Sequence, residues 1–256
     1  MELSTIAILI AAGVAAGAAN TVAGGGTFVS YPILLSLGLS PIAANVTSAV
    51  GLISGYAGGS VSYRRELRGQ GSRLRSMAIV AFVGAVSGAL LLLVTPGEVF
   101  SSIVPYLVLA ACVLLMVQGR LSRTLTESRT RTSTPAREVG VLAQVGVFFG
   151  AVYGTYFGAG VGVLLLAVLG SLIADDLQRI NGLRTLLSLG IKLVGVGIFA
   201  FSGEVAWAYA LVLLPSAYAG GVLGAQITRR MSSVVLRGTV IACGLLVAAL
   251  LLLNGG

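Results

Sequence analysis

The chain has 256 residues, of which 57% are hydrophobic and 9% are charged, and its mean hydropathy is +1.01. Soluble domains carry about a quarter charged residues, so this composition excludes an ordinary water-soluble domain and indicates a membrane protein. The formal net charge of +8 comes from arginines in loops between apolar segments, so we do not expect nucleic-acid binding. The chain has no histidine and only two cysteines, both in apolar segments, so we expect no metal, cofactor or disulfide framework.

Apolar segments follow one another along the chain, and each is predicted to be helical. The first has no basic residues before it, so we interpret it as a membrane segment and not as a cleaved leader. A stretch rich in serine, threonine and arginine, residues 120–138, is predicted to be a flexible cytoplasmic linker between two transmembrane repeats, 1–119 and 139–256. The segments are 3–23, 27–38, 42–62, 76–95 and 99–119 in the first repeat, and 139–157, 161–174, 180–201, 205–225 and 234–253 in the second.

The two halves share landmarks at an offset of 136 residues. In each half a glycine-rich break precedes an asparagine by 21 residues, with Gly24 before Asn45 and Gly160 before Asn181. Overall identity at this offset is low, and a glycine-rich chain matches itself easily. The shared order of the landmarks nevertheless favours an internal duplication.

The placement of the arginines predicts the orientation of the chain. They cluster after residue 62, in the linker and near residue 230, and we place these loops in the cytoplasm because basic residues stay on that side. These cytoplasmic loop assignments are consistent with one another only if the glycine-interrupted stretches, 3–38 and 139–174, each enter and leave the membrane on the same side. Each stretch is then a helical hairpin, and the two halves have opposite orientations. Such an inverted-topology repeat is a recurrent plan of secondary transporters.

Each predicted hairpin has one arm that is too short for a hydrocarbon core of about 30 Å. We therefore expect the glycine tips to reach into the protein, where broken backbone can line a cavity. The alternative is that these glycines serve only tight helix packing. The fold predicted from the sequence is an all-α polytopic membrane protein with two inverted repeats and glycine-broken helical hairpins.

Lys192 is the only lysine in the chain and lies deep inside the apolar segment 180–201. A cation at that depth costs several kcal/mol unless it faces a cavity or a partner. Since no acidic residue stands within two helical turns of it, we interpret Lys192 as a binding residue for an anion; the alternative is an ammonium that reaches the interface. Arg184 falls on roughly the same side of a helix, about 12 Å away along the axis, which predicts an anion path. The alternative for Arg184 is an interfacial anchor or a partner of Asp175 or Asp176.

Several motifs carry a resemblance to a known family. The first half contains AGGGTFVSYPILLSLGLSPIAANVTSAVGLISGYAGGSVSYRREL, and the second contains YGTYFGAGVGVLLLAVLGSLIADDLQRINGLRTLLSLG, SGEVAW and AYAGGVLGAQITRRM. Over nearly its whole length apart from the linker, the chain resembles the TauE/SafE family, the sulfite exporter or sulfonate-uptake permease family of bacterial membrane proteins. The resemblance implies a transporter for sulfur-containing anions such as sulfite, sulfoacetate or other sulfonates. Lysine at position 192 departs from the family pattern, which often has a neutral polar residue there.

The predicted anion site combines backbone amides at the glycine tips with neighbouring polar side chains. An oxyanion in a low-dielectric site needs hydrogen-bond donors, and N–H groups at the starts of helix fragments supply them without a titratable group. For any one asparagine or serine of the set, helix capping is an equal alternative. The predicted substrate contacts are Asn20, Thr21, Gly24, Gly25, Gly26, Thr27, Asn45, Ser48, Tyr56, Tyr156, Gly160, Gly162, Asn181, Arg184 and Lys192.

The leading interpretation is a secondary transporter or facilitator for a small sulfur-containing anion in the bacterial inner membrane. An inside-negative potential favours outward movement of one negative charge by about 2.3 kcal/mol per 100 mV, so export needs no coupling ion and we favour it over import. The alternatives are a transporter of another small organic anion such as a carboxylate, and a membrane scaffold or assembly protein. We do not expect an enzyme, because the sequence places no nucleophile and base at depth. The coupling ion and a homodimeric state stay open.

Overall fold

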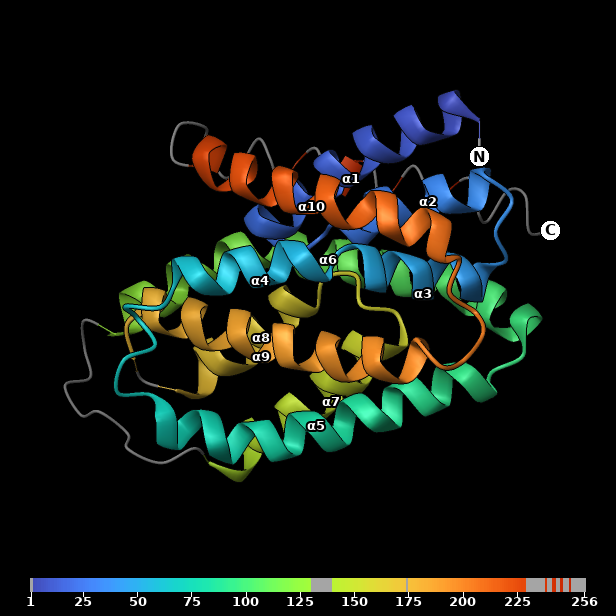
Figure 1. Ribbon diagram of the computed structural model, residues 1–256. Coiled ribbons are helices and arrows are strands. Elements are labelled where there is room, and N and C mark those ends of the chain that lie inside the picture. Colours follow the sequence, from blue (N-terminus) through green and yellow to red (C-terminus); the bar gives the residue numbers. More distant parts are fainter. Residues whose placement is uncertain are drawn as a thin grey trace.

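The computed structural model describes residues 2–129, 140–173 and 175–228, and a few positions beyond them. The described residues are almost entirely helical and include no β-strand. Ten helices are assigned to this part of the chain (Figure 1). They are α1 (Leu3–Ala23), α2 (Thr27–Ser36), α3 (Pro41–Gly51), α4 (Ile53–Ser62), α5 (Gly71–Val94), α6 (Gly97–Arg129), α7 (Val141–Tyr156), α8 (Val161–Leu172), α9 (Leu177–Phe199) and α10 (Trp207–Thr228).

The helices confirm most of the predicted segments. Helix α1 has the predicted bounds, and α2, α7 and α8 end within a few residues of theirs, because glycine-rich breaks stop the apolar runs. Helices α1, α5 and α9 contain stretches that are long and apolar enough to cross a membrane, namely Leu3–Asn20, Gly71–Val94 and Gln178–Phe199. The chain is thus an all-α protein of polytopic membrane type.

Two predicted elements differ from the structure, and a third is not described. The segment 42–62 is not one helix, because the chain breaks at Leu52 into α3 and α4. Helix α6 continues through the first part of the predicted linker to Arg129, so that part is helical and not an open loop. The remainder of the linker and nearly all of the segment 234–253 lie outside the described residues.

The helices form layers in which the two halves of the sequence interleave. In Figure 1 the pair α1 and α10 lies at one edge, the pair α5 and α7 lies at the other, and α3, α4, α8 and α9 lie between them. The most extensive packing joins α1 to α10 and α5 to α7, so each of these pairs contains one helix from each half. The predicted halves therefore do not form two separate bodies.

Glycine allows the helices of these two pairs to approach closely. A Cβ atom on Gly17 of α1 would lie 2.1 Å from the carbonyl oxygen of Ala217 in α10, and one on Gly220 would lie 2.1 Å from that of Val14. In the other pair, a Cβ on Gly88 of α5 would lie 2.3 Å from the carbonyl oxygen of Val152 in α7. Small residues at such contacts are typical of helix packing in lipid, where backbone proximity replaces the hydrophobic driving force.

The offset of 136 residues relates these contacts to one another. It carries α1 onto α7 and α5 onto α10, so the pair α1/α10 corresponds to the pair α7/α5. It also carries Gly24 onto Gly160, and both have the left-handed backbone conformation, with φ of 70° and 78°. These correspondences support an internal duplication, and the inverted orientation of the two halves stays a prediction.

Two ends of the helix bundle can be defined by their loops. The basic end contains residues 63–70, before α5, and residues 175–176, before α9. The opposite end contains the turn between α5 and α6 and the connection between α9 and α10. Figure 1 shows these two pairs of connections at opposite sides of the molecule.

Candidate functional site

The glycine tips of the two hairpins meet inside the protein. Gly24 ends α1 and Gly160 precedes α8, and the N–H group of Gly160 donates a hydrogen bond to the carbonyl oxygen of Gly24 at 3.1 Å. A Cβ on Gly24 would lie 3.4 Å from the Cα of Gly162, so there is little room for a side chain between the tips. All of these glycines are buried. The prediction that the tips reach into the protein is confirmed, and we call their meeting point the junction.

Several tip amides already have backbone acceptors. The N–H of Gly24 donates to the Asn20 carbonyl at 2.8 Å, and that of Gly25 donates to the Ala19 carbonyl at 3.5 Å. Together with the bond from Gly160, these contacts show that the expectation of open amides is wrong for Gly24, Gly25 and Gly160. For Gly24 and Gly25 the cause is the left-handed turn, because it directs the N–H groups that follow α1 back onto the last carbonyls of the helix, whereas the Gly160 N–H bonds to the other hairpin. Ligand donors at the junction therefore have to come from side chains or from the remaining tip amides.

Lys192 lies beside the tip of the α7–α8 hairpin. Its side chain is only 4% exposed, and its Nζ donates a hydrogen bond to the carbonyl oxygen of Gly154 at 2.9 Å. Gly154 is in the last turn of α7, where carbonyl groups without a helical partner carry the negative end of the helix dipole. No carboxylate of the described residues forms an ion pair with Lys192. The ammonium thus points into the protein, and the alternative of an ammonium at the interface is wrong.

Arg184 and Ser188 continue the polar face of α9 towards the basic end. The Arg184 Nε donates to Asn181 Oδ1 at 2.8 Å, and a Cβ on Gly162 would lie 2.8 Å from Arg184 Nη1. Ser188 is 1% exposed, and its hydroxyl has no hydrogen-bond partner among the described residues. Residues 184, 188 and 192 recur every four positions and therefore share one side of the helix. Ser188 was not among the predicted site residues, although its spacing from Arg184 and Lys192 indicates it.

Asn20 and Tyr56 approach Arg184 from the first half of the chain. Asn20 is 7% exposed, and neither polar atom of its amide has a partner in ordinary hydrogen-bond geometry among the described residues. Tyr56 is buried, and its hydroxyl interacts with the Asn20 amide and with the charge of Arg184. The structure thus brings together three predicted site residues, Asn20, Tyr56 and Arg184, which we call the junction cluster.

Other predicted site residues have structural partners instead. Asn45 Nδ2 donates to the Tyr156 carbonyl at 2.8 Å, so this amide caps the end of α7. Ser48 forms a 2.6 Å hydroxyl pair with Ser30. The Tyr156 hydroxyl donates to Thr95 Oγ1 at 3.4 Å, and Thr95 follows α5 at the end opposite the basic end. Thr27 is buried in the first turn of α2. The side chain of Thr21 lies outside the described part of the structure.

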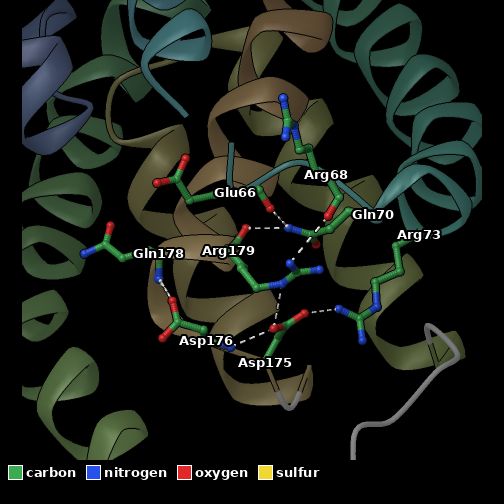
Figure 2. A network of polar contacts seen from close by, with 8 residues as sticks. All are labelled: Glu66, Arg68, Gln70, Arg73, Asp175, Asp176, Gln178 and Arg179. Carbon is green, nitrogen blue, oxygen red and sulfur yellow. Dashed lines mark hydrogen bonds and ion pairs between the residues drawn. The ribbon is translucent and has the colours of Figure 1, made fainter. Parts of the chain in front are cut away.

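A polar network at the basic end fixes the start of α9 (Figure 2). Gln70 donates from its amide to the carbonyl oxygens of Glu66 and Arg179, each at 3.0 Å. Asp175 forms ion pairs with Arg73 and with Arg179, the latter at 3.0 Å. The network therefore ties the loop before α5 to the helix that carries Arg184, Ser188 and Lys192.

Protonation of Asp175 is expected to weaken this network. Burial alone would raise the pKa of the Asp175 carboxyl, but hydrogen bonds from the Asp176 N–H and Arg73, and the charges of Arg179 and Arg73, outweigh it and lower the pKa. A lowered folded-state pKa stabilises the fold above the unfolded pKa of about 3.9, and this contribution is lost as pH falls through the folded value. We expect Asp175→Asn to lower the free energy of unfolding at pH 7 by about 1 kcal/mol, since part of the interaction is screened by solvent.

Thermal unfolding in detergent between pH 3 and pH 7 tests this expectation. The difference in Tm between the wild type and Asp175→Asn should shrink as the pH falls below about 4 and through the lowered folded-state pKa of Asp175, because the wild-type carboxylate then also becomes neutral. Glu204→Gln, at an exposed carboxylate of the opposite end, is the matched control. A difference in Tm that stays constant over this pH range would contradict a charged role for Asp175.

Comparisons with known proteins agree with this architecture. The family model described as "Sulfite exporter TauE/SafE" matches residues 9–251. A "Probable membrane transporter protein ORF9" of Sinorhizobium sp. is 25% identical over 225 residues, which cover 88% of this chain and 82% of the relative. A "Probable membrane transporter protein" of Haemophilus influenzae is 23% identical over 254 residues, or 99% of this chain and 97% of the relative. The "Probable membrane transporter protein YfcA" of Escherichia coli K12 is 24% identical over 248 residues, which cover 96% of this chain and 89% of the relative.

No solved structure matches the chain significantly. The family assignment therefore rests on sequence, and the match to the family model covers nearly the whole chain. The all-helical architecture and the membrane-length helices are consistent with that match. This protein belongs to the TauE/SafE family.

Proposed function

We propose that this protein is a secondary transporter or facilitator that moves a small sulfur-containing anion, sulfite or an organosulfonate such as sulfoacetate, across the bacterial inner membrane. The description of its family and the names of its relatives support transport across a membrane. The observation that favours an anion is Lys192, a buried ammonium at the junction with no ion-paired carboxylate among the described residues.

The chemistry of the junction suits an anion that binds and leaves unchanged. Lys192 donates one N–H to the Gly154 carbonyl, and its ammonium has two further N–H groups. In a water-excluded interior a positive charge acts over a longer range than in water. Arg184 lies on the same side of α9 nearer the basic end, and its charge would favour entry of an anion from that end. Transport of this kind needs no bond to be made or broken, and we propose no enzymatic activity.

The orientation and direction of transport follow from charge. We place the basic end in the cytoplasm, because arginine-rich loops remain there. An inside-negative membrane potential then favours outward movement of a singly charged anion by about 2.3 kcal/mol per 100 mV. We therefore propose export without an obligatory coupling ion.

Flux measurements in proteoliposomes test the proposal. Purified protein should catalyse saturable movement and counterflow of labelled sulfite or sulfoacetate, and other sulfonates should compete. A negative potential on the side that the basic end faces should speed movement away from that side. Movement of carboxylates but not of sulfur anions would replace the substrate with another organic anion. Absence of flux for any anion in folded protein would contradict transport and favour a scaffold or assembly role.

A further inference from the structure

Asn20 is the strongest sign of an unassigned ligand contact in the described structure. Its side chain is more than nine-tenths buried, and neither its Nδ2 nor its Oδ1 has a partner in ordinary hydrogen-bond geometry among the described residues. The Tyr56 side chain interacts with this amide but does not satisfy it. Buried amides are nearly always hydrogen-bonded, because an unsatisfied one forfeits its hydration without compensation. Asn20 lies one turn before Gly24, so its amide stands next to the junction.

The packing around Asn20 directs its amide towards α4. The Cβ atom of Asn20 would lie 3.1 Å from a Cβ on Gly26, which places the base of the side chain against the tip. Its Nδ2 would lie 3.8 Å from a Cβ on Gly55, the residue before Tyr56. The Tyr56 hydroxyl interacts with the Asn20 amide, and the positive charge of Arg184 acts electrostatically on the same hydroxyl.

Asn181 orients the Arg184 guanidinium at this place. Its Oδ1 accepts the hydrogen bond from Arg184 Nε, so the edge of the guanidinium that carries the Nη atoms is directed away from Asn181. Arg184 Nη1 lies against Gly162, where any side chain would collide with it at 2.8 Å. Asn181 is thus a positioning residue, and Gly162 allows the guanidinium to reach the tip of the α7–α8 hairpin.

We propose that the junction cluster, Asn20, Tyr56 and Arg184, binds the head group of a singly charged sulfur oxyanion of the sulfonate type. This proposal rests on the transport function above and specifies its binding site. An amide NH2, a phenol and a guanidinium supply N–H and O–H donors from three helices, which suits the three oxygens of such a head group. Lys192 adds a second positive charge at the tip of the α7–α8 hairpin, where its Nζ lies against Gly158 while Arg184 lies against Gly162.

Asn20→Asp separates a ligand contact from a packing role. The two side chains have nearly the same shape, but aspartate places a negative charge beside Arg184 where the ligand would bind. We expect binding of methanesulfonate, measured by calorimetry on protein in lipid nanodiscs, to weaken at least about a hundredfold. The Tm of Asn20→Asp should equal or exceed that of the ligand-free wild type, because the carboxylate replaces the missing anion.

Further variants complete the test. Asn20→Leu and Tyr56→Phe each remove donors to the anion and should weaken binding about ten- to hundredfold. Ser54→Ala is the matched control on α4, because the Ser54 hydroxyl donates to the Leu214 carbonyl of α10 at 2.7 Å and lies outside the junction cluster. This variant should bind methanesulfonate like the wild type. Acetate is the comparison probe, and its binding should be weaker because it presents only two oxygens.

The outcomes distinguish the binding site from the function. If the wild type binds methanesulfonate and Asn20→Asp binds it equally tightly, the junction cluster is not the site, while transport of a sulfur anion stands. A lower Tm for Asn20→Asp together with unchanged binding would assign Asn20 to packing and would likewise overturn the proposal. If the folded wild type binds neither methanesulfonate nor sulfite, the proposed substrate class itself fails.

Discussion

Lys192→Met is expected to remove sulfur-anion flux in proteoliposomes while leaving the protein folded. Methionine has a similar length and no charge, and replacement of a buried charge by a well-packed apolar side chain often costs little stability. Loss of a buried charge that faces a bound anion costs about 2–5 kcal/mol, which corresponds to a decrease in transport of about 30-fold or more. The Tm in detergent and the elution profile should stay close to those of the wild type.

Lys192→Gln separates the charge of this residue from its hydrogen bond. Glutamine retains an N–H donor for the Gly154 carbonyl, the acceptor of the lysine in the wild type. If the charge of Lys192 attracts the anion, Lys192→Gln should lose sulfur-anion flux to the same extent as Lys192→Met. Normal flux in Lys192→Gln combined with low flux in Lys192→Met would show that the lysine serves only to hold the end of α7. Normal flux in both variants would remove Lys192 from the transport mechanism.

Gly158→Ala is expected to displace the same ammonium without a change at position 192. Gly158 has a φ of +82°, and a Cβ there would lie 2.0 Å from Lys192 Nζ and 2.9 Å from the Gly154 carbonyl oxygen. The lysine can move aside only by giving up its hydrogen bond to Gly154. The left-handed backbone costs alanine about 1–2 kcal/mol, and overpacking adds about 1–3 kcal/mol. We therefore expect a loss of about 2–5 kcal/mol in stability and a large loss of flux.

Gly203 offers a matched control for the backbone strain. Its φ is +80°, and nothing lies within 4 Å of a Cβ built there. Gly203→Ala should therefore lower the free energy of unfolding only by the cost of the backbone strain, about 1–2 kcal/mol. In thermal unfolding, the excess cost of Gly158→Ala should shrink when Lys192→Met is added, because the two positions are in contact. If Gly158→Ala and Gly203→Ala lower the free energy of unfolding equally, no steric collision with Lys192 occurs at position 158.

The sequence predicted local breaks in the helices well. Gly24 and Gly160 stop apolar runs that would otherwise continue, so the hairpin tips and the bounds of α1 could be predicted from the glycine pattern alone. The break at Leu52 has no such local signal, since it involves no proline and no positive φ. There a Cβ on the neighbouring Gly51 would meet Leu213 at 2.5 Å, so contact with α10 accompanies the break. Contacts of this kind are invisible to a reading of local periodicity.

The candidate site was predictable in its residue types but not in its pairings. A search for acidic residues near Lys192 could not find its partner, because that partner is a backbone carbonyl 38 residues earlier in the chain. For the same reason Asn45 was predicted as a ligand contact or as a cap of its own helix, whereas it caps α7 from 111 residues away. Side-chain chemistry can be read from a sequence, but which helix end lies opposite a donor depends on the tertiary arrangement.

The interleaving of the two halves has a consequence for biosynthesis. The chain leaves the ribosome from its N-terminus, so α1 enters the bilayer long before α10, the helix against which Gly17 packs, has been translated. Until then the surface of α1 that packs on α10 faces only lipid. Insertion into the membrane must therefore come first, and final assembly must wait for the last helices, as in a two-stage folding process. A ribosome-bound chain that stops before α10 would be inserted but could not complete its core.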